Sequence, residues 1–258
     1  MKKILIIGGS GFIGRNIIEI FSKNKKYQIL STFCKNKKNQ VSSNNVRYLK
    51  FDFSCNKNFN KIKEFDPNYI FFLAWNKIPN FSKQQSKINY IATKNFFRKT
   101  TNFKSLKSII YFGSCLEILK SRLNQNNYYF VDAKLKLKKY LNNLYKHSSV
   151  NIVWLRLFYV YGPYQRMKSL IPSLIIANKK RKKLKINNYK LKNDYIHVYE
   201  IVNILKILIS TKNVFNLINI KSNLLVSVGE VVNRVNELFF NKKNKKKNLL
   251  LSKPSVLE

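Results

Sequence analysis

Three glycines near the start of the chain, Gly8, Gly11 and Gly14, have the spacing that binds the pyrophosphate of a dinucleotide. The apolar run 4–7 before them predicts a buried strand, and the apolar spacing after them predicts a helix. Strand, glycine turn and helix together present backbone N–H groups to a phosphate. We expect Gly8 to allow a tight turn, Gly11 to admit the phosphates and Gly14 to let the helix pack closely on the strand. The alternative is an ordinary glycine-rich turn without a ligand.

The end of the second predicted strand bears on the choice of dinucleotide. An acidic residue about 20 positions after the glycines would bind the ribose 2′-OH of NAD. Residues 31–38 contain no acid, whereas Lys35 and Lys37 would attract the 2′-phosphate of NADP. The sequence therefore slightly favours NADP over NAD as the cofactor, although lysine is common throughout the chain.

Apolar runs alternate with helical patterns through the first 160 residues or so. The predicted strands cover 4–7, 28–33, 46–51, 69–74, 108–112 and 150–157, and the predicted helices cover 14–23, 57–65, 83–100 and 130–145. This alternation predicts an α/β protein, a Rossmann-type doubly wound parallel sheet with helices on both faces. Ligands of such sheets bind at the carboxyl ends of the strands.

The regular alternation weakens after Gly162. We expect helices over 170–178, 199–209 and 228–240 and short strands over 185–188, 195–197 and 215–219. These pieces predict a small C-terminal substrate lobe over 163–258, interleaved with an NAD(P)-binding domain over 1–162 as one structural unit. The tail from Asn241 is rich in Lys and Asn and is expected to be mobile, although 249–251 could add a strand.

The charge of the chain has two interpretations. There are 50 Lys and Arg residues against 11 acidic ones among 258, a formal net charge of +39. Clustered cations bind nucleic acid by releasing counterions. However, the chain is rich in Lys, Asn, Ile, Phe and Tyr, which an AT-rich genome favours, and its lysines are spread along the sequence. We therefore expect a solvated surface and no nucleic-acid partner.

Other features of composition indicate the setting of the protein. The three cysteines, Cys34, Cys55 and Cys115, are too few and too scattered for a disulfide framework or a zinc site. Met1 leads directly into the first strand without a signal peptide, and no apolar run reaches the roughly 18 residues that span a bilayer. We expect a cytoplasmic protein with no metal and no membrane partner.

Several segments together resemble the NAD(P)-dependent epimerase/dehydratase family, the extended short-chain dehydrogenase/reductases that modify sugar nucleotides. They are the glycine motif of residues 8–14, Asp52 after the third strand, the pair Leu73-Ala74 flanked by Phe72 and Trp75, Asn89 in the next helix, the Leu-Arg…Tyr-Gly-Pro element of 155–163 and the Asp-Tyr-Ile-His-Val element of 194–198. The resemblance covers about residues 3–240. Any one of these motifs alone would be weak evidence.

The resemblance implies roles for particular residues. The residues implied to bind the cofactor are Gly8, Gly11, Phe12, Ile13, Gly14, Lys35, Asp52, Phe53, Leu73, Ala74 and Lys134. Those implied to bind substrate are Arg156, Tyr159, Asp194 and His197, although a structural hydrogen bond is the alternative for His197. The family also implies a possible homodimer through the helices over 83–100 and 130–145, and a place in polysaccharide biosynthesis.

The chain departs from the family where the proton is transferred. The family uses a Tyr-x-x-x-Lys pair on one helix face, in which the Lys lowers the pKa of the Tyr. Lys134 matches the Lys, but the Tyr position is Phe130, which has no proton to exchange. Cys115 occupies the expected Ser/Thr position with Ser114 beside it, and Glu117 matches an acid of some dehydratases and reductases.

Three hypotheses follow for activity. Another residue could supply the proton: Tyr129 or Tyr128, which immediately precede the predicted helix, or Cys115 or Glu117. Lys134 and water could sustain weak catalysis. The chain would then be an epimerase, dehydratase or 4-ketoreductase of a nucleotide-activated sugar, with hydride transfer to or from the nicotinamide. Alternatively, it could be a catalytically impaired nucleotide-binding protein, a sensor or an RNA-associated protein.

Overall fold

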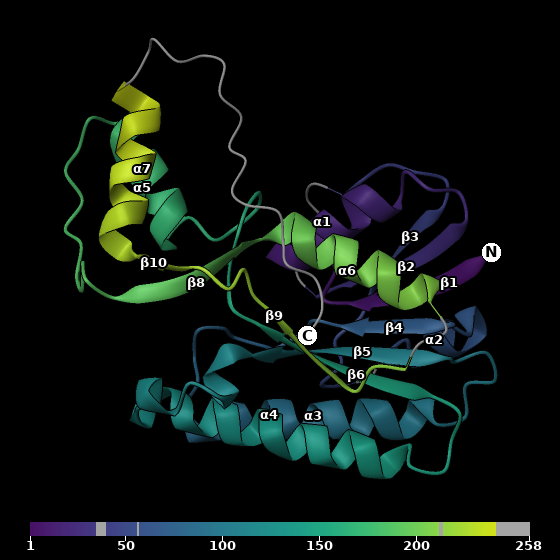
Figure 1. Ribbon diagram of the computed structural model, residues 1–258. Helices are drawn as coiled ribbons and strands as arrows, with labels where there is room; N and C mark the ends of the chain where they lie inside the picture. Colours follow the sequence, from purple (N-terminus) through teal and green to yellow (C-terminus); the bar gives the residue numbers. More distant parts are fainter. Residues whose placement is uncertain (35–39, 56, 212–213, 241–258) are drawn as a thin grey trace.

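A seven-stranded parallel sheet forms the centre of the molecule (Figure 1). The computed structural model describes residues 1–34, 40–55, 57–211 and 214–240. The strand order is β3-β2-β1-β4-β5-β6-β9, for β1 (Lys2–Ile7), β2 (Tyr27–Phe33), β3 (Val46–Lys50), β4 (Tyr69–Phe72), β5 (Ser108–Ser114), β6 (Asn151–Leu157) and β9 (Leu217–Ile220). The predicted Rossmann-type α/β fold is confirmed.

Helices cover both faces of this sheet because its central strands are apolar on both sides. From β1, Ile4 and Ile6 pack under α1 (Phe12–Phe21) and α6 (Val198–Ser210). Leu5 and Ile7 face the opposite core, under α2 (Phe59–Phe65), α3 (Lys83–Thr100) and α4 (Gln125–Leu144). Strands buried on both faces read as continuous apolar runs, which is why the sequence revealed them.

The start of α4 differs from the prediction. The helix begins at Gln125, five residues before the predicted 130. Asn124 is its N-cap: the Asn124 side chain accepts a hydrogen bond from Asn127 N, and the Asn127 side chain accepts one from Asn124 N. This reciprocal capping box turns an Asn-rich stretch, typical of a loop, into a helix start. Tyr128 and Tyr129 therefore lie within α4, and the expectation that they precede the helix is wrong.

The small lobe contains a second, three-stranded sheet and a helix pair. Strands β7 (Tyr159–Tyr161), β8 (Lys192–His197) and β10 (Leu225–Ser227) form the sheet, and α5 (Leu170–Lys179) packs on α7 (Val228–Phe240) (Figure 1). Strands β7 and β10 were not predicted. The strand predicted at 185–188 is absent: Asn188 has a φ of +57°, and its carbonyl accepts a hydrogen bond from Leu191 N at 2.9 Å, which closes a turn.

Part of the C-terminal segment belongs to the main sheet. The strand expected at 215–219 is β9, which pairs in parallel with β6, and α6 is the crossover helix before it. The expectations for Lys35, Lys37 and the tail from Asn241 lie outside the described residues. Within the described ranges, no helix is both long and apolar enough to cross a bilayer.

Candidate functional site

The glycine turn has the conformation that its proposed role requires. Gly8 has a φ of +91°, which L side chains rarely adopt, and its N–H donates to Thr32 Oγ1 at 3.1 Å. A Cβ at position 14 would lie 2.6 Å from the Gly8 carbonyl oxygen, so the first turn of α1 can approach this closely because residue 14 is glycine. A Cβ on Gly9 would lie 2.0 Å from Ser31 Oγ, so Gly9 is constrained as well, which was not predicted from the sequence.

The N-terminus of α1 suits a phosphate group. Gly11 is the N-cap residue, so no N-cap side chain bonds to the first turn, and that turn contains no acidic residue. Phe12 and Ile13 are the first two helical residues, and their N–H groups have no acceptor within the helix. Free N–H groups and the positive end of the helix dipole favour an anion. The residues present therefore fit a dinucleotide pyrophosphate at the predicted place.

Asp52 follows β3 with its carboxylate held in place. Its Oδ1 accepts hydrogen bonds from Ser54 N at 2.8 Å and Ser54 Oγ at 2.6 Å, and its Oδ2 accepts one from Cys34 Sγ at 3.6 Å. Partial burial alone would raise the pKa of Asp52, but hydrogen bonds from Ser54, Cys34 and Asn76 outweigh it and lower the pKa. The carboxylate is charged and available at the edge where β2 and β3 end.

The end of β4 lies directly beside the glycine turn. Leu73 N–H donates to Ile7 O at 2.9 Å, and Ala74 N would lie 3.0 Å from a Cβ on Gly8. Leu73 and Ala74 are thus brought together with the glycines, as the cofactor prediction requires. Phe53, also predicted to bind the cofactor, buries its ring in the core, so only its backbone remains for such a contact.

Asn89 on α3 anchors the loop that follows β4. Its Oδ1 accepts a hydrogen bond from Asn76 N at 2.7 Å, and its Nδ2 donates to Asn76 O at 3.2 Å and to Gln85 O at 2.9 Å. The side chain is fully buried. Asn89 therefore holds in place the segment that carries Trp75.

Lys134 lies in a cage of aromatic rings at the carboxyl end of the central strands. Its Nζ donates to Phe112 O at 2.6 Å. The Nζ lies 4.8, 4.7 and 5.5 Å from three ring centroids, those of Trp75, Tyr111 and Phe130. Burial lowers the pKa of Lys134 from 10.5 to about 7, and the nearby Glu117 carboxylate opposes part of this effect. The amine is therefore partly neutral near neutral pH.

Phe130 is enclosed by other rings. It is one helical turn before Lys134, and its ring centroid lies 5.1 Å from that of Trp75 and 4.6 Å from that of Phe81. The residue is buried. The position where a proton donor was expected is therefore part of a hydrophobic cluster.

Ser114, Cys115 and Glu117 lie together at the carboxyl end of β5, around the short helix η1 (Cys115–Glu117). Ser114 Oγ accepts a hydrogen bond from Leu116 N at 3.3 Å, and Ser114 N donates to Glu117 Oε1 at 2.8 Å. Burial raises the pKa of the Cys115 thiol to about 11, so it stays protonated at neutral pH. Of the three, Ser114 is the most exposed.

Glu117 is bound on several sides. Its side chain is fully buried, and its Oε2 accepts hydrogen bonds from Trp154 Nε1 and from Arg156 Nε, both at 2.9 Å. Arg156, predicted to bind substrate, is therefore ion-paired inside the protein. The ion pair between Glu117 and Arg156 links the segment after β5 to β6. A catalytic role for Glu117 and a substrate-binding role for Arg156 stay predictions.

Tyr129, in the first turns of α4, borders an open cavity. The cavity has a volume of about 640 Å³ and is lined by Leu123, Asn124, Gln125, Tyr128 and Tyr129. Tyr128 and Tyr129 are 54% and 36% exposed, and the Nζ of Lys83 lies 5.9 Å from the Tyr129 ring centroid. Of the four candidate proton donors, these two tyrosines face the cavity.

The two candidates from the 194–198 element make structural contacts. The carboxylate of Asp194 accepts hydrogen bonds from Ser222 N at 2.7 Å, Ser222 Oγ at 2.9 Å and Asn223 N at 2.9 Å. His197 is the N-cap of α6, where its Nδ1 accepts from Tyr199 N at 3.3 Å, and burial lowers its pKa. His197 thus makes a structural hydrogen bond, which was the alternative to substrate binding.

Arg122 is a site residue that was not predicted from the sequence. Its guanidinium donates to Tyr159 OH at 2.9 Å, and it also donates to Asn193 Oδ1 and Lys192 O. It therefore ties the segment after η1 to both β7 and β8 of the small lobe, and it holds the predicted substrate residue Tyr159. One signal could have found it: the chain has only eight arginines among 50 cations, and Arg is the cation suited to several fixed hydrogen bonds at once.

Comparisons with known proteins agree with this geometry. The sequence model of the NAD dependent epimerase/dehydratase family matches residues 4–220. The ADP-L-glycero-D-manno-heptose-6-epimerase of Brachyspira hyodysenteriae is 25% identical over 92% of this chain and 81% of its own length. The dTDP-D-glucose 4,6-dehydratase of Dictyostelium discoideum is 26% identical over 91% of this chain, which spans 62% of that protein.

Solved structures share the fold. The Bordetella bronchiseptica enzyme WbmF, in complex with NADH, superposes with a TM-score of 0.78 at 20% identity, covering 93% of this chain and 78% of its own. The UDP-glucuronic acid 4-epimerase of Bacillus cereus, in complex with NAD, superposes with a TM-score of 0.77 at 20% identity, covering 92% of this chain and 82% of its own.

Proposed function

The chain belongs to the NAD-dependent epimerase/dehydratase family, and on that premise we propose that it is an NAD(P)-dependent enzyme acting on a nucleotide-activated sugar. The reaction would be an epimerisation, a dehydration or a 4-keto reduction. The observation that carries the proposal is the glycine turn, where Gly8 has a positive φ and Gly14 leaves no room for a Cβ. That geometry exposes the uncapped N-terminus of α1 to a pyrophosphate.

The proposal assigns cofactor contacts along the carboxyl edge of the sheet. Gly11, Phe12 and Ile13 would bind the pyrophosphate, Asp52 the adenosine end, and Lys134 the nicotinamide ribose. When bound, the nicotinamide would accept or donate the hydride. The hydrogen bond from Lys134 Nζ to Phe112 O fixes the position of the amine. The amine still has further N–H groups that can donate to a ribose hydroxyl.

The proton has to come from a residue other than 130 in this proposal. Phe130 has no ionisable group, the Cys115 thiol is buried with its pKa raised to about 11, and Glu117 is held by an ion pair. Tyr129 and Tyr128 border the cavity, so we assign proton transfer to one of these hydroxyls. Tyr129 is preferred because it is the less exposed of the two.

The first test is a titration with NADH and NADPH, followed by nicotinamide fluorescence at moderate salt to suppress nonspecific anion binding. Gly11→Asp is the informative variant. Gly11 has a φ of −77° and is an N-cap residue, so Asp suits the backbone there, and a Cβ would lie 3.2 Å from Gly8 O, a contact that a shift of a few tenths of an ångström relieves. The carboxylate of Asp would repel the pyrophosphate. We expect saturable binding that Gly11→Asp abolishes with little change in Tm. No binding of either nucleotide to the native protein would overturn the proposal.

Turnover is tested next with a panel of nucleotide sugars. Tyr129→Phe and Tyr128→Phe remove one hydroxyl each from adjacent positions and form a matched pair. We expect Tyr129→Phe to lower kcat by about 100-fold or more, within the range of general acid–base catalysis, with Tyr128→Phe near the native value. If neither changes kcat in an active protein, the assignment of the proton is wrong.

The preference for NADP over NAD rests on Lys35 and on the missing acid at the end of β2. We expect tighter binding of NADPH than of NADH, and a smaller difference in Lys35→Glu, because a carboxylate repels the 2′-phosphate. Equal affinities in the native protein would contradict this preference.

Three wider expectations belong to the same proposal. A homodimer through α3 and α4 is supported by the exposed apolar side chains Ile88, Ile91 and Leu135 on those helices, and light scattering of native protein and Ile91→Lys tests it. A role in polysaccharide biosynthesis and a cytoplasmic location come from the family. If NADH binds but no sugar nucleotide turns over, the burial of Phe130 favours the alternative of a nucleotide-binding protein without catalysis.

A further inference from the structure

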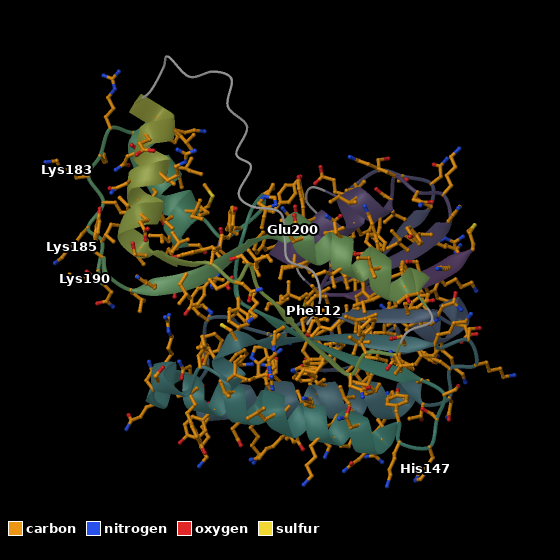
Figure 2. The ribbon with its side chains drawn as sticks, viewed as in Figure 1. Phe112, His147, Lys183, Lys185, Lys190 and Glu200 are labelled. Atoms are coloured by element: carbon orange, nitrogen blue, oxygen red, sulfur yellow. The ribbon has the colours of Figure 1, made fainter. Side chains whose placement is uncertain are left out.

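Residues 179–192, here called the basic loop, connect α5 to β8 and concentrate positive charge. Eight of these fourteen residues are cationic and none is acidic: Lys179, Lys180, Arg181, Lys182, Lys183, Lys185, Lys190 and Lys192. All eight are exposed. In Figure 2, the labelled Lys183, Lys185 and Lys190 follow the outer edge of the small lobe, away from the central sheet. The charge therefore forms one patch at the periphery of the molecule.

The described structure neutralises little of this patch: Lys192 interacts electrostatically with the Glu230 carboxylate but forms no ion pair with it. Cations near a helix C-terminus complement the helix dipole, but that dipole amounts to only about half a charge and accounts for Lys179 and Lys180 at most. Across the described ranges, no carboxylate forms an ion pair with any of the eight cations. The labelled Glu200 lies on α6, away from the basic loop (Figure 2). The patch is free to meet an anionic partner.

Large apolar side chains are exposed beside these cations. Leu184, Tyr189 and Leu191 in the basic loop are 41%, 47% and 40% exposed. Strand β10, which pairs with β8, adds Leu224 just before it and Leu225, at 49% and 67%. Backbone bonds from Val228 N to Leu191 O and from Gly229 N to Tyr189 O, both of 2.9 Å, hold the end of the basic loop against the start of α7. Cations and apolar side chains are therefore presented by a backbone that is tied down at one end.

We propose that the basic loop binds the surface of an anionic lipid membrane. The lysines would contact headgroup phosphates, and Leu184 and Leu191 would enter the boundary of the acyl chains. Single-stranded nucleic acid would use the cations equally well, but it binds by stacking bases on aromatic rings, and Tyr189 is the one aromatic residue of the basic loop. The exposed leucines favour lipid.

This proposal revises the expectation of no membrane partner. That expectation rested on the absence of an apolar run long enough to span a bilayer, whereas surface binding needs none. The proposal is independent of the cofactor site, because none of the residues assigned to the cofactor lies in the basic loop.

The test is cosedimentation of the full chain with phosphatidylcholine vesicles, with and without phosphatidylglycerol. The variant combines Lys183→Gln, Lys185→Gln and Lys190→Gln, and the matched control combines Lys23→Gln, Lys25→Gln and Lys26→Gln, three exposed lysines near the end of α1. Each lysine at an anionic membrane surface contributes about fivefold, so the first variant should bind phosphatidylglycerol vesicles roughly 100-fold more weakly. The control keeps all the cations of the basic loop and should lose far less.

A second variant separates lipid from other polyanions. Leu184→Ser keeps every charge, so it should weaken vesicle binding several-fold and leave binding to a single-stranded RNA oligonucleotide unchanged. The far-UV circular dichroism spectrum and the Tm report that each variant is folded. Equal losses in the two lysine variants would overturn the proposal, because charge anywhere on the chain would then suffice. Native protein that binds the RNA but not the vesicles would also overturn it and assign the basic loop to nucleic acid.

Discussion

Replacing Lys134 by methionine should make the protein more stable at neutral pH. The buried amine has a pKa of about 7 in place of 10.5. One pKa unit corresponds to about 1.36 kcal/mol, so this shift means that burying the charged amine lowers the free energy of unfolding by roughly 5 kcal/mol. Methionine is of similar length, has no charge and suits an aromatic cage. The folded protein tolerates the cost because the fold is stabilised elsewhere, in the two large cores on either side of the sheet.

Two losses reduce the gain. The hydrogen bond from Lys134 Nζ to Phe112 O disappears, which costs about 1 kcal/mol. The contacts with the rings of Trp75, Tyr111 and Phe130 lose up to about 2 kcal/mol of cation–π energy. The net expectation is that the variant unfolds with roughly 2 kcal/mol more free energy than the native protein at neutral pH.

The dependence on pH provides the sharper test. Between the folded pKa of about 7 and the unfolded pKa of 10.5, the unfolded state binds more protons, so this group makes native stability rise with pH. The variant lacks that rise. Urea unfolding at about pH 7 and about pH 9.5 measures the free energy of unfolding of both proteins. Between these two pH values, the difference in that free energy should shift by roughly 3 kcal/mol in favour of the native protein.

The contributions of other titrating groups cancel when the free energies of unfolding of the two proteins are subtracted. The pKa of Cys115 is raised to about 11 from 9.0, so that thiol lowers stability as pH rises above about 9, opposite to Lys134. This effect is present in both proteins and cancels. A difference that does not change between the two pH values would refute the assignment of a buried, partly neutral Lys134. If Lys134 also contacts the nicotinamide ribose, the more stable variant will bind NADH less tightly, a trade-off expected at functional sites.

Three further variants test the site. Phe130→Tyr should leave kcat unchanged or lower, because the new hydroxyl enters an apolar cluster; a large gain measured in the turnover assay would instead reveal an impaired ancestral site. Glu117→Gln should lower the free energy of urea unfolding by about 3–5 kcal/mol, since it leaves the largely buried guanidinium of Arg156 without an opposite charge, and near-native unfolding would contradict the ion pair. Asp194→Asn should destabilise the turn at 222–224 by about 1–3 kcal/mol without changing the Kd for NADH; hydrogen exchange unchanged in that turn would show that the carboxylate is not holding it.

The central fold could be predicted because its signals are local. The helix over 83–100 was predicted with the bounds of α3, whose N-terminus is marked by Ser82, a side chain that accepts a hydrogen bond from Gln85 N. Strands buried on both faces appear as apolar runs. By contrast, β7 and β10 have three residues each, too few for any periodicity, and their pairing with β8 depends on contacts distant in sequence.

In the candidate site, too, features that depend on local sequence were predictable, and features that depend on contacts between distant segments were not. The roles of Gly8 and Gly14 follow from backbone geometry within one turn, so the sequence was sufficient for them. The enclosure of Phe130 by Trp75 and Phe81 joins three segments, and no spacing in the sequence indicates it. The sequence showed that residue 130 lacks a hydroxyl, but only the packing shows that its ring closes the cage around Lys134.

Few acidic residues of this chain are available to pair with its surface lysines. Several of its 11 acids are held by internal bonds: Asp52 by Ser54, Asp66 by Ser105, Glu117 by Arg156 and Asp194 by the turn at 222–224. An acid held in this way is a poor partner for a surface lysine. Even if the lysines arose from base composition, the fold pairs few of them with carboxylates among the described residues: Lys136 forms an ion pair with Asp132, and the cations of the basic loop form none. Positive charge that arose from base composition alone would therefore still attract anionic nucleotides to the edge of the sheet and anionic surfaces to the small lobe.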